Sequence, residues 1–286
     1  MNRIYYNGVI KTMDNAYPEV SAIWVKDGVI LRVGSDEEIL AVAGEEAKKV
    51  DLEGKLALPG FCDTHMHMLF YGSLLQRIDM TDAKTWEECK GWMAADVEAA
   101  RAEGRWVLGR SFNQDYWSDT NKMPDRHDLD AIAEDVPIAL VRACGHIACC
   151  NTKALELCGL WNERPETTKE TMDFGADGLP NGYVRENTTA VLTKEFATYD
   201  LAQTKALLKQ ATQNAVKKGI VQAHTDDFNL LVEGDLKQNL QAYKELVEEG
   251  ELPIRIYEQI RFQNSDQLQE FFDMGYKMKD KIGRFK

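Results

Sequence analysis

Two histidines separated by one residue are the strongest candidates for chemistry in this sequence. His65 and His67 close the apolar segment 58–67. On an extended chain, residues i and i+2 project to the same face, so both imidazoles can reach one ion, and Asp63 falls in register with them. A pair of half-buried, hydrogen-bonded histidines at a strand end would have the same spacing. The spacing alone therefore predicts either a metal centre or a structural pair.

The elements that must position this pair change character along the chain. Residues 1–57 contain short apolar segments around Asn7-Gly8 and Asp27-Gly28, dipeptides that favour two-residue hairpin turns, and we predict a small all-β module there. In residues 58–286, apolar strands alternate with helical segments, which is typical of parallel strands joined by helical crossovers. The expected strands are 56–63, 106–111, 137–143, 220–224 and 253–260, and the expected helices are 85–103, 151–158, 201–218 and 236–249.

One segment interrupts this alternation. Residues 162–187 contain Gly175, Gly178, Pro180 and Gly182 and lack a clear hydrophobic period. Glycine and proline punctuate regular structure, so we predict an irregular insertion here.

Charge and composition exclude several classes of partner. The chain has 286 residues and a formal net charge of -13, so its field repels phosphate backbones and anionic lipid surfaces. We therefore expect no nucleic-acid partner. We also expect no membrane partner, because no apolar run of about 18 residues and no secretory signal is present. The six cysteines lie in the middle of the chain and are expected to be reduced. These features predict a cytoplasmic protein.

The whole arrangement resembles the amidohydrolase superfamily, in the branch that contains N-substituted formamide deformylase. In that superfamily a small β-sandwich accompanies a TIM barrel, and the first barrel strand ends in a His-x-His pair like that of His65 and His67. Family members often have Gly-Trp-Asp where this chain has Ser-Phe-Asn at 111–113. The other segments that agree in order and spacing are 25–30, 109–114 with Trp117, 145–146, 151–155, 182–187 and 219–226.

The resemblance implies an α/β fold with a partial TIM (β/α)8 barrel over 58–286, preceded by part of a β-sandwich over 1–57. It implies a divalent metal, with zinc expected, held by His65 and His67. It also implies a small-molecule substrate, in which a carbon-nitrogen bond other than a peptide bond, of an amide, formamide or cyclic amide, is hydrolysed by metal-activated water. A metal-dependent isomerase or lyase on the same scaffold is a weaker alternative.

Further site residues follow from the same resemblance. His146 is the candidate catalytic residue, because a neutral imidazole at the barrel mouth can donate a hydrogen bond to the substrate carbonyl or its oxyanion. His224 is a candidate for substrate binding. Each histidine closes an apolar strand, so we expect both at the end of the barrel that carries His65 and His67, although either can equally be a core histidine.

The remaining candidates for substrate binding are less specific. Asn113 and Gln114 follow a strand, and Trp117 can wall an apolar pocket, although aromatic residues after a strand are usually core. Arg185 is a candidate as well, but a salt bridge to Glu186 that closes a loop is the more common arrangement.

A cysteine-rich segment offers a competing metal site. Cys144, His146, Cys149 and Cys150 lie within seven residues. Structural zinc sites usually space paired ligands by two to four residues, so the adjacent Cys149 and Cys150 favour packing over ligation.

The end of the chain bears on the functional expectation. In the superfamily the further metal ligands and the aspartate base come after the region that this sequence covers, so we expect a fragment of an enzyme about twice as long. Its open sheet edge would favour homo-oligomers. The alternative is a truncated, non-catalytic relative that serves as a binding or regulatory module.

Overall fold

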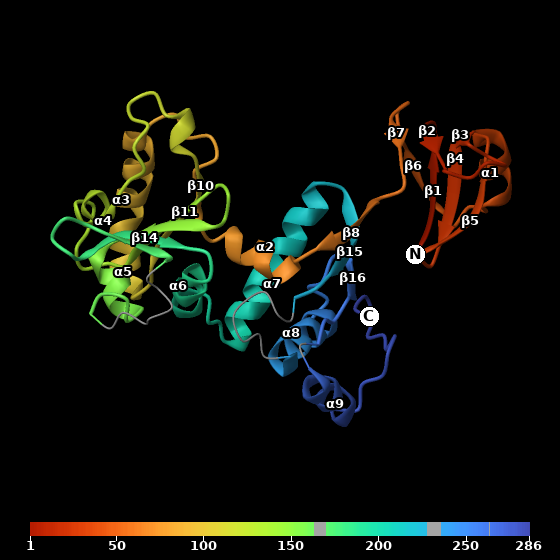
Figure 1. Ribbon diagram of the computed structural model, residues 1–286. Helices are drawn as coiled ribbons and strands as arrows, with labels where there is room; N and C mark the ends of the chain where they lie inside the picture. Colours follow the sequence, from red (N-terminus) through yellow and green to blue (C-terminus); the bar gives the residue numbers. More distant parts are fainter. Residues whose placement is uncertain (163–169, 228–235, 263) are drawn as a thin grey trace. The chain divides into compact units, whose positions relative to one another are not determined.

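The computed structural model describes residues 1–162, 170–227, 236–262 and 264–286, and the chain divides into two units, Met1–Phe61 and Cys62–Lys286 (Figure 1). The first unit contains two sheets, with strand orders β5-β4-β1-β6 and β3-β2-β7. Its packing as a β-sandwich stays a prediction. Its elements are β1 (Asn2–Tyr6), β2 (Val9–Lys11), β3 (Glu19–Val20), β4 (Ala22–Lys26), β5 (Val29–Gly34), α1 (Asp36–Val42), β6 (Lys48–Asp51) and β7 (Leu56–Ala57).

The two turn dipeptides of the first unit behave differently. Asp27-Gly28 joins the antiparallel strands β4 and β5 with φ values of 50° and 81°, as a two-residue hairpin turn requires. Asn7-Gly8 does not form a hairpin, because β1 and β2 belong to different sheets. The expectation of an all-β module is also wrong, since α1 begins after Ser35, which forms a capping box with Glu38.

The second unit contains a three-stranded sheet in the order β16-β15-β8, which bears the predicted histidine pair. The carboxyl ends of its strands lie together: the carbonyl of Met66 accepts a hydrogen bond from the Asp226 amide, and Thr225 is the register partner of Glu258. Within the described ranges this sheet does not close into a barrel. Its elements are β8 (Phe61–Met66), α2 (Met68–Leu74), α7 (Leu201–Lys217), β15 (Ile220–Thr225), α8 (Leu236–Glu248), β16 (Arg255–Glu258) and α9 (Ser265–Asp273).

Helices α2, α7 and α8 form one hydrophobic core with this sheet. Ala223 of β15 and Ile256 of β16 are buried in that core together with Tyr243 of α8. Alternation along the strand therefore turns His224 to the opposite face of the sheet. Helix α2 lies so close to α7 that a Cβ added at Gly72 would stand 2.6 Å from the backbone oxygen of Leu207.

The chain between β8 and β15 forms a second, six-stranded sheet in the order β13-β14-β12-β11-β10-β9. Strands β9, β10 and β11 are parallel, whereas β12, β14 and β13 pair antiparallel. The strands expected at 106–111 and 137–143 are thus part of this sheet and do not pair with the His-x-His strand. Its elements are β9 (Ile78–Asp79), α3 (Trp86–Glu103), β10 (Val107–Phe112), α4 (Arg126–Asp130), β11 (Ile138–Arg142), β12 (Ile147–Cys150), α5 (Thr152–Leu157), β13 (Met172–Phe174), β14 (Pro180–Arg185) and α6 (Thr188–Phe196).

The expected irregular insertion contains regular structure. Its described part contains the antiparallel pair β13 and β14, and residues 163–169 lie outside the described residues. Gly182, with a φ of 100°, is packed against Arg126: a Cβ there would lie 2.8 Å from the Arg126 backbone nitrogen. The glycines that suggested irregularity thus include one that permits close packing of a strand on a helix.

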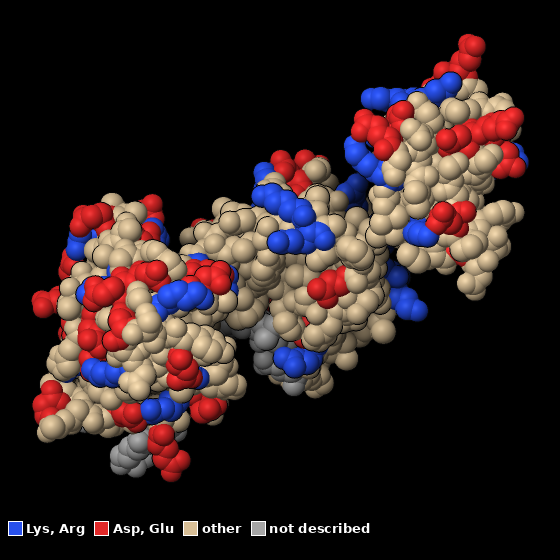
Figure 2. Space-filling model, turned by 90° about the horizontal axis from the view of Figure 1, so that it is seen from above, with Lys and Arg blue, Asp and Glu red and all other residues tan. Residues whose placement is uncertain are grey.

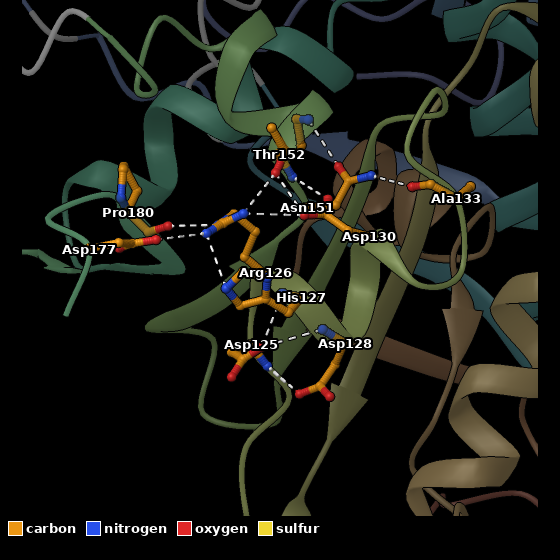
Figure 3. Close-up of polar contacts among 11 residues, drawn as sticks. Asp125, Arg126, His127, Asp128, Asp130, Ala133, Asn151, Thr152, Asp177 and Pro180 are labelled. Atoms are coloured by element: carbon orange, nitrogen blue, oxygen red, sulfur yellow. Dashed lines mark hydrogen bonds and ion pairs between the residues drawn. The ribbon is translucent and has the colours of Figure 1, made fainter. Parts of the chain in front are cut away.

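A buried arginine of α4 joins β14 of this sheet to α5 (Figure 3). The Arg126 side chain is only 9% exposed; its Nε donates to the Pro180 carbonyl at 2.9 Å, and its guanidinium lies 3.4 Å from Asp130 and 3.7 Å from Asp177. Asp130 in turn accepts from the Thr152 hydroxyl at 2.7 Å. Because a buried charge is costly unless it is paired and hydrogen-bonded, this network holds α4, α5 and β14 in one arrangement.

The surface carries both signs of charge. On the face drawn in Figure 2, acidic and basic side chains are interspersed. Ion pairs join charged side chains of opposite sign elsewhere along the chain as well as locally, such as Arg105 with Asp96 and Lys205 with Glu245. In the part of the chain that the structure describes, no helix combines the length and apolarity needed to cross a bilayer.

Candidate metal centre

The predicted histidine pair lies where β8 ends and α2 begins. His65 is exposed near the end of β8, and His67 is the half-buried residue that precedes α2. Their ring centroids are 5.3 Å apart with an interplanar angle of 79°. Asp63 does not face them as a third ligand but accepts a hydrogen bond from the His65 amide at 3.1 Å. The two imidazoles are thus close enough to share one ion.

A backbone contact fixes the proton of His67. Its Nδ1 lies 2.8 Å from the carbonyl oxygen of Asp226. A carbonyl oxygen can only accept, so Nδ1 carries the hydrogen in this contact, and in the neutral ring Nε2 then keeps its lone pair. Histidines that ligate metals commonly donate their other ring N–H in this way. The contact therefore prepares Nε2 of His67 for coordination.

The first turn of α2 is capped from a distant part of the chain. His67 offers the helix no side-chain cap of its own. Instead, the Met68 amide donates to the Thr225 hydroxyl and the Leu69 amide donates to the Asp227 carboxylate, both at 2.8 Å. Both acceptors are buried. The unpaired amides at the start of the helix are thus satisfied by the end of β15.

Buried carboxylates surround this connection. Asp227 accepts from the Tyr243 hydroxyl at 2.5 Å, and Glu258 accepts from the Asp227 amide at 2.9 Å. Burial raises the pKa of Asp227, and burial together with the nearby charge of Asp227 raises the pKa of Glu258 well above its usual range. The acids thus lie in surroundings that disfavour their charged form.

Two carboxylate oxygens at this strand end are buried without a hydrogen-bond partner, Oδ1 of Asp226 and Oε2 of Glu258. Unpaired buried oxygens of this kind are stabilised by a nearby cation. Imidazole nitrogen and carboxylate oxygen are also donors that zinc accepts. The residues at this end of the sheet therefore fit a divalent metal, although within the described ranges no three His, Cys, Asp or Glu side chains converge as ligands.

His224 projects from β15 to the face away from the helices. Its Nε2 lies 3.0 Å from the Gln222 side-chain amide, and its ring lies 5.1 Å from that of Tyr257. The strand that carries it ends beside β8, as expected. Among the described contacts none joins it to His65 or His67, so its role in substrate binding stays a prediction.

The structure places His146 elsewhere than expected. It lies in the turn between β11 and β12 of the six-stranded sheet, with a side chain that is 67% exposed. Its Nδ1 lies 3.3 Å from Glu186, and no described contact joins it to His65. It was expected at the strand ends that carry His65 and His67, but β11 belongs to the six-stranded sheet and β8 to the three-stranded one. The catalytic role of His146 stays an untested prediction.

The other candidates for substrate binding have local partners. Asn113 and Gln114 both accept hydrogen bonds from Arg142, at 3.2 and 3.0 Å. Trp117 is buried in the hydrophobic core, where it stacks on Phe112. Its side chain therefore does not line an open pocket.

Arg185 does pair with an acid, but with Asp173 at 2.5 Å instead of the expected Glu186. The β13–β14 hairpin explains this choice: Met172 pairs with Val184 and the Arg185 amide donates to the Thr171 carbonyl, so Asp173 lies diagonally across the hairpin from Arg185, within reach of its guanidinium. The hydrogen bonds that the guanidinium donates to the Asp173 carboxylate raise the pKa of Arg185. This structural pairing leaves little of the guanidinium for a substrate.

The cysteines do not form a metal cluster. Cys149 and Cys150 are neighbours on β12 and point into two different hydrophobic cores, so they cannot turn both thiols onto one ion. Complete burial raises the pKa of each thiol well above its ordinary value. Cys144 is exposed in the turn before the strand.

The residues that support His67 were not identified from the sequence. Thr225, Asp227, Tyr243 and Glu258 lie within a single hydrogen-bonded group at the ends of β15 and β16. The available signal was the run of polar residues 224–227 directly after an apolar strand. At the carboxyl end of a parallel strand, such residues are candidates for a site.

Comparison with known proteins agrees with this arrangement. Residues 48–283 match the Amidohydrolase family. The chain is 26% identical over 258 residues to the putative amidohydrolase YtcJ of Bacillus subtilis, covering 90% of this chain and 48% of that protein. It is 27% identical over 182 residues to N-substituted formamide deformylase of Arthrobacter pascens, covering 63% of this chain and 33% of that protein. The chain thus spans about half the length, or less, of these relatives.

A solved structure shares the fold. An uncharacterized metal-dependent hydrolase from Pyrococcus furiosus superposes with a TM-score of 0.74 at 24% identity, over 100% of this chain and 55% of that chain. The mixed α/β architecture is therefore that of a known hydrolase fold. Since the family match extends over most of the sequence, the chain belongs to the Amidohydrolase family.

Proposed function

We propose that this chain is part of a metal-dependent hydrolase that cleaves a carbon-nitrogen bond other than a peptide bond, in an amide, formamide or cyclic amide. His65 and His67 would hold a divalent metal, with zinc expected. The observation that carries the proposal is the His67 ring, whose Nδ1 proton is committed to the Asp226 carbonyl while Nε2 is left to coordinate. The relative named N-substituted formamide deformylase supports this class of bond.

A divalent metal at this position supplies an acidified water and polarises a substrate carbonyl. The protein residues have separate tasks. Asp226 keeps the proton of His67 at Nδ1, and the buried Oε2 of Glu258, which has no hydrogen-bond partner, would be stabilised by a cation at this end of the sheet. His224 and Gln222 line the face away from the helices, where they can donate hydrogen bonds to a bound substrate.

A catalytic metal needs more protein ligands than His65 and His67. A catalytic zinc usually takes three protein ligands and a water. Among the described residues His65 and His67 are the pair that can share an ion. The proposal therefore includes at least one ligand from a further segment or a second chain.

The test uses the protein at its full natural length. Metal content is measured by mass spectrometry, and hydrolysis is screened with a panel of N-formyl and N-acyl amines and cyclic amides. The double variant His65→Ala, His67→Ala should lose both metal and activity while its circular dichroism stays unchanged. His127→Ala is the matched control, because that histidine lies on α4, outside the proposed centre. Full activity in the double variant, or a metal-free active enzyme, would refute the proposal.

A further inference from the structure

We propose that Thr225 and Asp227 are positioning residues for His67, which hold its ring in place by capping the first turn of α2 from the end of β15. This inference rests on the proposed function in so far as His67 is a metal ligand. It concerns residues that contact neither metal nor substrate. Their effect reaches the site through the backbone of residues 67–69.

The first support is the hydroxyl of Thr225. This side chain is fully buried, and its Oγ1 accepts from the Met68 amide at 2.8 Å. Met68 directly follows His67, whose backbone dihedrals of -129° and 89° lie outside the helical region. The hydroxyl thus holds the residue at which the chain changes from strand to helix.

The second support is Asp227, which accepts hydrogen bonds from several parts of the chain. One carboxylate oxygen accepts from the Leu69 amide at 2.8 Å and the other from the Tyr243 hydroxyl at 2.5 Å. Its backbone carbonyl accepts from the Asn239 side chain at 3.3 Å. Tyr243 and Asn239 are buried residues of α8. The start of α2 is therefore attached to the rigid core through Asp227.

The third support is the residue between these two. The Asp226 carbonyl accepts from Nδ1 of His67, and the Asp226 amide donates to the carbonyl of Met66. Residues 225–227 therefore contact four consecutive residues of the ligand segment, 66–69, through side chain and backbone in turn. A shift of the 225–227 backbone would move the acceptor of the His67 proton.

Such supporting groups change metal affinity without touching the metal. Loss of an outer partner of a ligating histidine typically weakens metal binding by about 10-fold to 100-fold. Thr225→Val removes the hydroxyl at nearly constant volume, so the expected loss of zinc affinity is about 10-fold. Thr225→Ser keeps the hydroxyl and should restore it.

The experiment compares Thr225→Val with Thr212→Val. Thr212 is also fully buried and donates its hydroxyl to the Leu208 carbonyl at 2.8 Å within α7, away from the ligand segment. Ring nitrogen chemical shifts from NMR report the tautomer of His67, and amide hydrogen exchange reports the cap at Met68. A zinc titration followed on the His65 and His67 ring signals gives the affinity.

We expect Thr225→Val, but not Thr212→Val or Thr225→Ser, to shift the His67 ring signals, to speed exchange at Met68 about 10-fold and to weaken zinc binding. Identical ring signals and exchange in Thr225→Val and Thr212→Val would overturn the inference. If ring signals and exchange change but zinc never binds to the His67 ring, the positioning role stands and the proposed metal centre fails. The two ideas are thus separable.

Discussion

His67 and Asp226 are 159 residues apart in the sequence, yet Nδ1 of one lies 2.8 Å from the backbone carbonyl oxygen of the other. Because the acceptor is a main-chain atom, no substitution at position 226 that preserves the backbone removes it. Asp226→Asn should therefore leave the His67 tautomer unchanged. Ring nitrogen shifts measured by NMR would show this, and a change of tautomer in that variant would mean that the carboxylate controls the proton.

The second prediction concerns metal retention. Two imidazoles leave at least one position of a catalytic zinc unfilled, so residues 1–286 by themselves should lose zinc on dialysis. The residual zinc should match that of His65→Ala, His67→Ala, and the chain should not hydrolyse amides above the rate of this double variant. Mass spectrometry of the dialysed protein is the measurement. Stoichiometric zinc after dialysis would contradict the prediction.

The third prediction concerns the contact between α2 and α7. A methyl group at Gly72 would stand 2.6 Å from a backbone oxygen of α7, which cannot move aside as a flexible side chain can. Gly72→Ala should lower the free energy of unfolding by about 1 to 3 kcal/mol.

Gly91 provides the matched control, because it lies within α3 and a methyl group there meets nothing within 4 Å. Gly91→Ala should raise the free energy of unfolding by about 0.5 to 1 kcal/mol through the gain in helix propensity. Urea titrations measure both variants. Equal effects of the two substitutions would show that α2 and α7 are not in tight contact.

The fourth prediction concerns thiol reactivity. Partial burial opposes ionisation of Cys144, but hydrogen bonds from the His146 amide and the Arg142 guanidinium hold its pKa below its ordinary value. Iodoacetamide near neutral pH should therefore modify Cys144 rapidly, because the thiolate is the reactive form. Cys149 and Cys150, buried and with raised pKa values, should react only after unfolding. Peptide mass spectrometry identifies the modified sites. Labelling of Cys149 in the native protein would show that its thiol is not buried in the core.

The fifth prediction concerns pH and the cap of α4. Burial would raise the pKa of Asp125, but the Lys122 ammonium and the amides of His127 and Asp128 hold it below its usual value. A carboxylate with a lowered pKa stabilises the fold above its unfolded pKa of about 3.9, and this contribution is lost as pH falls through the folded pKa.

Asp125→Ala should therefore cost about 1 kcal/mol at pH 7, and its difference from the native protein should shrink as the pH falls below about 4. Denaturant unfolding at a series of pH values measures this difference. A difference that grows toward acid would contradict the lowered pKa.

The sequence predicted those parts of the fold that depend on local chemistry. Asp27-Gly28 forms its hairpin because both residues accept positive φ, and the long helices α3 and α7 begin directly after Thr85 and Asp200, which cap them. The closeness of the two histidines is likewise a local feature, since His65 lies in β8 and His67 directly follows its last residue. None of these features requires knowledge of a distant partner.

The features that were missed depend on distant pairing. Strands β10 and β11 have the apolar pattern of barrel strands, but nothing in that pattern states which sheet they join. The same holds for Asn7-Gly8, whose flanking strands separate into two sheets. The supports of His67 come from residues about 160 positions away, and their contact follows only from the assembled sheet. The hydrophobic pattern of a segment predicts whether it forms a strand or a helix, whereas the strands beside which it lies depend on the tertiary structure.

The six-stranded sheet lies in sequence between two strands that are neighbours in space, β8 and β15. The order of folding follows from this arrangement. The contacts of β9 to β14 are short in sequence and form early, whereas pairing β8 with β15 must close a loop of about 150 residues. Folding of the intervening sheet shortens that loop, because a compact body replaces a flexible chain. The histidine site should thus be among the last parts of the molecule to become ordered.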